Sequence, residues 1–123
     1  MKQHSIQFLK LVNEAKKRII EITPEILKDK IDRQEHFSLI DVREDSEWPT
    51  GFIPTATHIS KGIIERDIEK IIPDLDTPIV VYCSGGFRSA LTADILQRMG
   101  YSHVHSLSGG LNGWADAGYK LKK

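Results

Sequence analysis

The sequence of 123 residues contains one cysteine, no excess of either charge and no long apolar run. A single cysteine excludes a disulfide within the chain, which fits a reducing compartment. Lys plus Arg and Asp plus Glu both number 17, so the basic excess typical of nucleic-acid or membrane-surface binding is missing. The first 22 residues carry too many charges for an export signal or a membrane span. We therefore expect a cytoplasmic protein that binds neither nucleic acid nor membrane.

Metal-binding patterns and repeats are also missing. The five histidines are scattered and show no metal-ligand spacing, and no second cysteine supports them. We expect no metal and no bound cofactor. The hydrophobic content of 40% is enough for one globular core.

The segment from Cys83 to Arg88 organises the chain. A short apolar, β-branched run ending at Tyr82 precedes it and predicts a buried strand. Apolar residues at helical spacing follow it and predict a helix that ends near Gly100. The segment is therefore a loop at a helix N-terminus, where free backbone N–H groups and the helix dipole favour an anion.

The only cysteine stands at the first position of this loop. A thiol at a helix N-terminus, with an arginine close by, is expected to be partly ionised at neutral pH. Adjacent glycines let several N–H groups converge on the sulfur. We predict that Cys83 is the catalytic nucleophile and that the rest of the loop binds the substrate: Ser84, Gly85, Gly86, Phe87 and Arg88. The alternative is that Cys83 is a small buried hydrophobic residue at a strand end.

Several motifs resemble those of the rhodanese family and occur in the family's order. Residues 41–59 contain Asp-Val-Arg-Glu, Glu-Trp and Gly-Phe-Ile-Pro, the loop from Cys83 to Arg88 follows, and residues 107–118 contain the glycine-rich last motif. Phe52 and Thr55 stand where the family usually has a histidine and a glycine. The resemblance covers about residues 23–121. It implies a rhodanese-like α/β fold, with a five-stranded, mainly parallel sheet and helices on both faces.

Before this region, apolar side chains in residues 5–22 follow a helical period, with Ser5 as a suitable N-cap. We expect an amphipathic helix that packs on the core of its own domain. The alternative is a docking or dimerisation helix. The chain then divides into an N-terminal helical extension, residues 1–22, and a rhodanese-like domain, residues 23–123.

Two further residues are candidates for a supporting role in the site. Asp41 and Arg43 follow a predicted strand at residues 38–42, and ligands of open α/β sheets bind at the carboxyl ends of strands. For Asp41, tying down the neighbouring loops is the favoured role.

The resemblance implies an enzyme of the thiosulfate sulfurtransferase (rhodanese) type. In this type of reaction we expect the Cys83 thiolate to take a sulfane sulfur from a donor such as thiosulfate and to hold it as a persulfide. It then passes the sulfur to cyanide, a thiol or a protein acceptor. Because no second cysteine is present, the acceptor must come from outside the chain. Two half-reactions on one cysteine predict ping-pong kinetics.

Two alternatives remain open at this stage. One is a sulfur-carrier or binding module with low turnover. The other is a phosphatase or arsenate reductase, because phosphatases of this fold also use a cysteine-to-arginine loop. Those loops have five residues between the two, whereas Cys83 and Arg88 enclose four, which suits a single sulfur atom better than a tetrahedral oxyanion.

Overall fold

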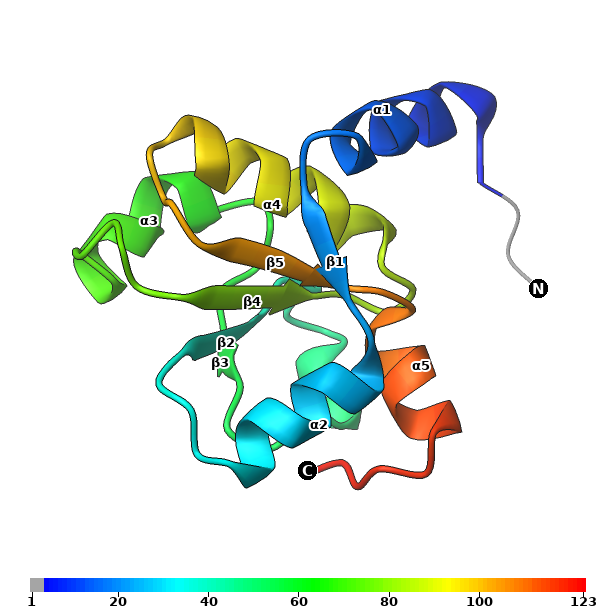
Figure 1. Cartoon of the computed structure of the whole chain (residues 1–123). Coiled ribbons are helices and arrows are strands. Elements are labelled where there is room, and N and C mark those ends of the chain that lie inside the picture. Colours follow the sequence, from blue (N-terminus) through cyan, green and yellow to red (C-terminus); the bar gives the residue numbers. More distant parts are fainter. Residues whose placement is uncertain (1–3) are drawn as a thin grey trace.

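The computed structural model describes residues 4–123, which form a five-stranded sheet with helices on both faces (Figure 1). The strand order is β1-β5-β4-β2-β3, and every neighbouring pair is parallel. The strands are β1 (Ile20–Ile22), β2 (Ser38–Asp41), β3 (Thr57–His58), β4 (Ile79–Tyr82) and β5 (Val104–Leu107). The predicted α/β fold with a five-stranded parallel sheet is confirmed.

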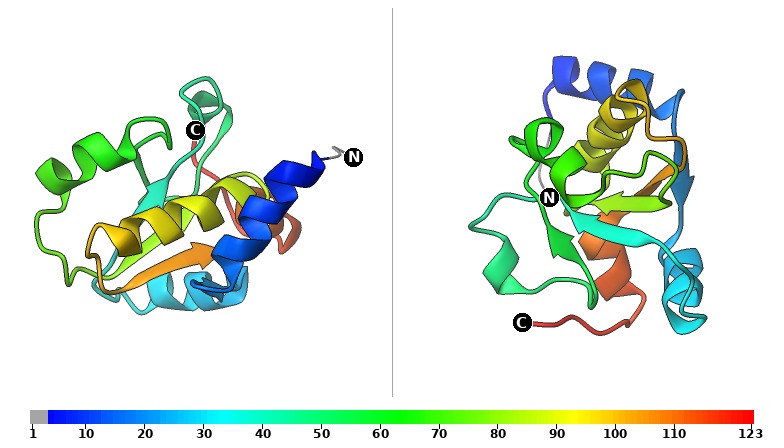
Figure 2. Two further views of the ribbon diagram at one scale, coloured as in Figure 1. Left: turned by 90° about the horizontal axis from the view of Figure 1, so that it is seen from above. Right: turned by 90° about the vertical axis from the view of Figure 1, so that its left-hand side faces the viewer.

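The helices form two layers around this sheet. Helices α3 and α4 cover one face, and α2 and α5 cover the other (Figures 1 and 2). In chain order the helices are α1 (Ile6–Lys16), α2 (Pro24–Asp32), a 3₁₀ turn η1 (Trp48–Thr50), α3 (Ile64–Ile71), α4 (Phe87–Arg98) and α5 (Gly110–Asp116).

The central strand β4 is buried on both faces, as its continuous apolar sequence predicts. Because side chains alternate across a strand, Val81 and Cys83 pack into the cluster under α3 and α4. Val80 and Tyr82 pack into the opposite cluster under α2 and α5. This alternation places the cysteine on the α4 side of the sheet, at the carboxyl end of β4.

The predicted helix over residues 5–22 is wrong in its last part. Helix α1 ends at Lys16, and Ile20–Ile22 form the edge strand β1 beside β5. Isoleucines favour extended backbone, and the free edge of β5 supplies hydrogen-bond partners that a local helical pattern does not reveal. Ser5 occupies the N-cap position of α1, but its side chain makes no capping hydrogen bond.

Helix α1 packs across α4, as expected for a helix covering its own domain (Figure 2). Val12 and Ala15 are buried in this contact, each 1% exposed. Next to it, the Arg18 guanidinium forms two hydrogen bonds of 2.9 Å with the Asp94 carboxylate on α4.

Residues 53–56 form a tight turn in which Thr55 stands where the family usually has a glycine. Thr55 has φ 78°, and Ala56 N–H donates to the Ile53 carbonyl at 3.1 Å. With Pro54 in the second position, this is the pattern of a type II turn, whose third residue favours glycine. A β-branched residue in this region of φ is strained.

We therefore expect Thr55→Gly to raise the free energy of unfolding, by about 1 kcal/mol, because relief of strain exceeds the added freedom of glycine in the unfolded chain. Urea denaturation measures the change. Thr57→Gly is a suitable control, because Thr57 lies in the extended strand β3, where glycine should destabilise. A lower stability of Thr55→Gly would contradict the predicted strain.

Candidate active site

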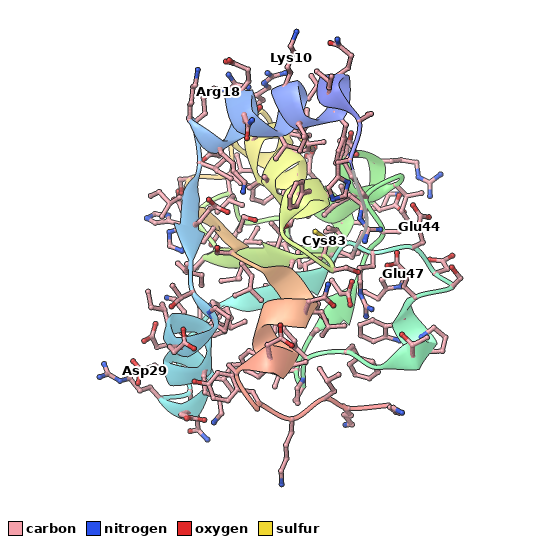
Figure 3. The ribbon with its side chains drawn as sticks, turned by 90° about the vertical axis from the view of Figure 1, so that its right-hand side faces the viewer. Lys10, Arg18, Asp29, Glu44, Glu47 and Cys83 are labelled. Carbon is pink, nitrogen blue, oxygen red and sulfur yellow. The ribbon has the colours of Figure 1, made fainter. Side chains whose placement is uncertain are left out.

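Cys83 lies at the carboxyl end of β4, where the chain turns into α4 (Figure 3). Only 1% of the residue is exposed. The loop that carries Glu44 and Glu47 follows β2 and lies beside Cys83 (Figure 3). The cysteine is therefore at the edge of the sheet where ligands bind in open α/β folds.

Backbone and side-chain donors surround the sulfur. The Gly86 and Ser89 N–H groups donate to Cys83 Sγ at 3.2 and 3.4 Å. The Ser89 hydroxyl lies 3.6 Å from Sγ and forms a 2.8 Å hydrogen bond with the Ser106 hydroxyl on β5. Both N–H groups belong to the start of α4, so the helix dipole also favours negative charge at this sulfur.

The loop owes its shape to close backbone approaches that require glycine. Gly86 has φ 94°, and a Cβ on it would lie 3.1 Å from Gly109 N. On the other side, the first residues of α5 hold the loop: Leu111 N–H donates to the Cys83 carbonyl at 2.8 Å, and Asn112 N–H donates to the Ser84 carbonyl at 2.9 Å.

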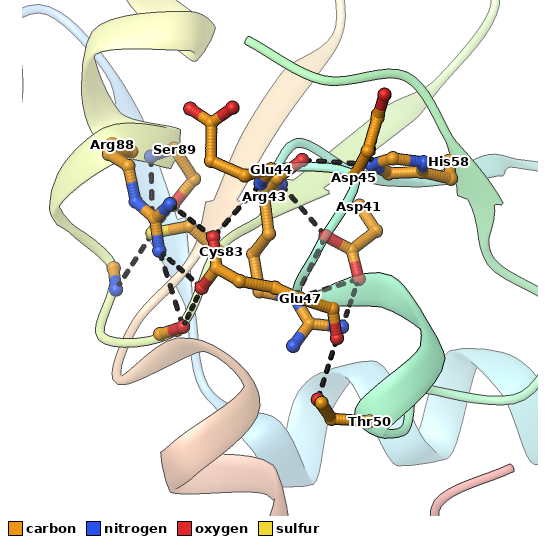
Figure 4. Close-up of polar contacts among 12 residues, drawn as sticks. Asp41, Arg43, Glu44, Asp45, Glu47, Thr50, His58, Cys83, Arg88 and Ser89 are labelled. Atoms are coloured by element: carbon orange, nitrogen blue, oxygen red, sulfur yellow. Dashed lines mark hydrogen bonds and ion pairs between the residues drawn. The ribbon is translucent and has the colours of Figure 1, made fainter. Parts of the chain in front are cut away.

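Arg88 is held by Glu47 rather than pointing freely into the loop (Figure 4). Its two terminal nitrogens donate to the two carboxylate oxygens at 2.7 and 3.2 Å. Ser84 Oγ accepts from Arg88 at 3.2 Å and donates to Glu47 at 3.1 Å. The paired arginine lowers the pKa of Glu47 from 4.5 to about 2, and the carboxylate raises the pKa of Arg88.

Because its pKa is lower in the folded state, Glu47 stabilises the protein above pH 4.5, and this contribution disappears as the pH falls toward 2. We expect Glu47→Gln to lower the free energy of unfolding at pH 7 by about 2 kcal/mol, less than the full pKa shift implies because water screens the pair. The difference from wild type should shrink between pH 4.5 and 2 in urea denaturation. Exposed Glu44, whose N–H donates to Glu47, offers the matched control Glu44→Gln. An equal loss in both variants would contradict a specific role of the Arg88–Glu47 pair.

Asp41 and Arg43 form a buried pair of their own. The guanidinium makes hydrogen bonds of 2.7–3.1 Å with the Asp41 carboxylate and donates to the Gly51 carbonyl at 2.7 Å. His58 Nε2 lies 2.8 Å from the Arg43 carbonyl. Among residues 4–123, no hydrogen bond joins either residue to the Cys83 loop. The contacts anchor the loop after β2, and a role toward substrate stays a prediction.

The structure adds residues that sequence reasoning did not place in the site: Glu47, Ser89, Ser106 and Gly110. Glu47 and Gly110 lie within the resembling motifs, and Ser89 follows Arg88 directly, so their positions carried a signal. No sequence feature pointed to Ser106, because its contact with Ser89 on α4 depends on β5 lying beside β4 in the sheet.

Within residues 4–123, no three or more His, Cys, Asp or Glu side chains are grouped to hold a metal ion. In the same part of the chain, every helix is too short or too polar to cross a membrane.

Taken together, the fold and the loop define an α/β domain with a cysteine cradled at the N-terminus of a helix. The family model of the rhodanese-like domain matches residues 23–117. The chain therefore belongs to the rhodanese-like family.

Named relatives and a solved structure show similarity over most of the chain. YtwF of Bacillus subtilis strain 168, provisionally named a sulfurtransferase, is 40% identical over 78% of this chain and 90% of its own length. A protein of Allochromatium vinosum named sulfurtransferase is 34% identical, over 82% of this chain and 92% of its own. The solved structure of RPA3614 from Rhodopseudomonas palustris, described as a protein of unknown function and possible tyrosine phosphatase, has a TM-score of 0.88 and 28% identity. It covers 99% of both chains.

Proposed function

We propose that this protein is a rhodanese-type sulfurtransferase that carries sulfane sulfur as a persulfide on Cys83. The observation that carries the proposal is the pair of N–H groups, from Gly86 and Ser89, that point at the sulfur at 3.2 and 3.4 Å. Backbone N–H groups aimed at a sulfur atom stabilise the negative charge that it carries during attack and as a persulfide. The family and the relatives named sulfurtransferases support the same reaction.

In the first half-reaction, the Cys83 thiolate attacks the outer sulfur of a donor such as thiosulfate. A new S–S bond forms, the S–S bond of the donor breaks, and sulfite leaves with the electron pair. Because only 1% of Cys83 is exposed, the donor must be slender at the sulfur that it delivers. The backbone N–H groups of residues 84–88, in the loop and the first turn of α4, then stabilise the negative terminal sulfur of the persulfide.

In the second half-reaction, an external nucleophile attacks the terminal sulfur and leaves Cys83 as the thiolate. Cyanide, a small thiol or the cysteine of a partner protein fits this step. The chain has no second cysteine that could take the sulfur internally. The reaction needs no resident metal or cofactor, because the donor and the acceptor supply the electron pairs.

A phosphatase reaction fits the site less well. A phosphatase loop needs an arginine free to bind phosphate oxygens, whereas both terminal nitrogens of Arg88 are held by Glu47. A carrier module with low turnover uses the same persulfide and differs only in the rate of the second step.

The test is the intact mass of the purified protein after incubation with thiosulfate. We expect a gain of about one sulfur atom, lost again when cyanide is added with release of thiocyanate. Protein alkylated at its single cysteine is the control and should gain nothing. A stable adduct without turnover would indicate the carrier module. No adduct, together with Cys83-dependent hydrolysis of a phosphate ester, would replace the proposal by the phosphatase reaction.

A further inference from the structure

We propose that helix α1 orders the sulfur-binding loop through Phe87, so that Phe87 and its α1 partner Phe8 are positioning residues for Cys83. This inference rests on the proposed function of Cys83 and deepens it. Helix α1 lies outside the region matched by the family model, which begins at residue 23. The contact therefore joins a segment outside the matched region to the loop inside it.

In the sequence, Phe87 lies between two residues of the loop that make hydrogen bonds important for the site. It is the first residue of α4 and lies directly between Gly86, whose N–H donates to the sulfur, and Arg88, which Glu47 holds. Its ring lies beside Gly85, because a Cβ built on that glycine would be 3.8 Å from Phe87 Cδ1. A shift of Phe87 therefore moves the N–H groups that face the sulfur.

Three residues of the N-terminal segment contact the same ring. The His4 ring lies with its centroid 4.4 Å from that of Phe87, and the Phe8 ring is stacked at 6.3 Å with an interplanar angle of 15°. The ammonium of Lys16 lies 5.3 Å from the centroid of the Phe87 ring. Aromatic stacking and a cation over a ring face are both attractive.

Helix α1 is itself fixed to the helix whose N-terminus points at the sulfur. Arg18 binds Asp94 through two hydrogen bonds, and Gln97 donates to the Arg18 carbonyl at 2.9 Å. The loop has glycines at positions 85 and 86, which offer no side chains for packing. The contact at Phe87 therefore adds a side-chain restraint to the hydrogen bonds from α5 that hold the other end of the loop.

The test is single-turnover loading of Cys83 with thiosulfate in Phe8→Ala. We expect the maximal loading rate to fall about tenfold while the half-saturating thiosulfate concentration changes less than about twofold, because misplaced N–H groups weaken the transition state more than donor binding. Phe87→Ala should show a similar loss, and the double variant little more. Phe8→Tyr should keep the wild-type rate.

Leu11→Ala is the matched control, because Leu11 lies on the same helix and is 62% exposed. Hydrogen exchange gives a second measurement: Phe8→Ala should speed exchange at the amides of residues 84–88 but not at those of β2. Unchanged loading and exchange in Phe8→Ala, or an equal loss in Leu11→Ala, would overturn the proposal. If the wild-type protein takes up no sulfur, the proposed function fails, and the loop exchange alone decides whether α1 orders the loop.

Discussion

Cys83→Ser is expected to lower the rate of sulfur transfer at least about 1000-fold. A serine hydroxyl stays protonated and is a poor nucleophile toward sulfur, so no covalent intermediate forms. The smaller oxygen still fits the buried site between the Gly86 and Ser89 N–H groups, and the fold should be retained. The loss of transfer rate would therefore be due to the missing sulfur atom and not to unfolding.

Thiocyanate formation from thiosulfate and cyanide measures the rate, and circular dichroism with urea denaturation checks that the variant is folded. A folded Cys83→Ser variant that kept more than about a tenth of the wild-type rate would refute the covalent mechanism. Initial rates at varied concentrations of both substrates should give parallel double-reciprocal lines for the wild type, because sulfite, the first product, leaves before the acceptor binds.

The second large effect is expected at Gly110, the first residue of α5. Gly110→Ala should lower the free energy of unfolding by about 3 kcal/mol and abolish sulfur loading. The residue has φ 55°, and an added Cβ would lie 2.6 Å from the Ser84 carbonyl oxygen and in still closer contact with that of Cys83. Relief of this clash requires α5 and the Cys83 loop to separate, which breaks the hydrogen bonds that Leu111 and Asn112 donate.

Gly113→Ala is the matched control on the same helix. A Cβ there would have no neighbour closer than 3.5 Å, and the helical position favours alanine over glycine. We expect this variant to load sulfur normally and to be as stable as the wild type. Urea denaturation and intact mass after thiosulfate treatment measure both properties, and normal loading by Gly110→Ala would show that the loop tolerates the displacement.

Elements with strong local signals were predicted well. The apolar run before Cys83 forms β4, and the helix after it, α4, ends at Arg98, with Met99 as its C-cap and Gly100 in the left-handed region at φ 108°. These signals are local, because β-branched residues, helical spacing and glycine each act within a few residues. The same local pattern was misleading at Ile20–Ile22, where pairing with β5 outweighed a helical period.

The wider surroundings of the sulfur depend on contacts between distant segments. Glu47 binds Arg88 across 41 positions of sequence, and Ser106 reaches Ser89 across 17. Helix α1 packs on α4, and its Phe8 ring stacks on Phe87, the first residue of α4. None of these partners can be derived from spacing along the chain, because strand order and helix packing decide which side chains face one another.

By itself, then, the sequence determined the family, the alternation of strands and helices, and the position of the cysteine at the start of a helix, because motifs, hydrophobic period and glycines are properties of neighbouring residues. Only the tertiary structure decided that Arg88 forms an ion pair with Glu47, that Gly110 must lack a side chain, and that α1 contacts Phe87. The physical reason is that burial and close packing join segments whose separation in sequence carries no information about their distance in space.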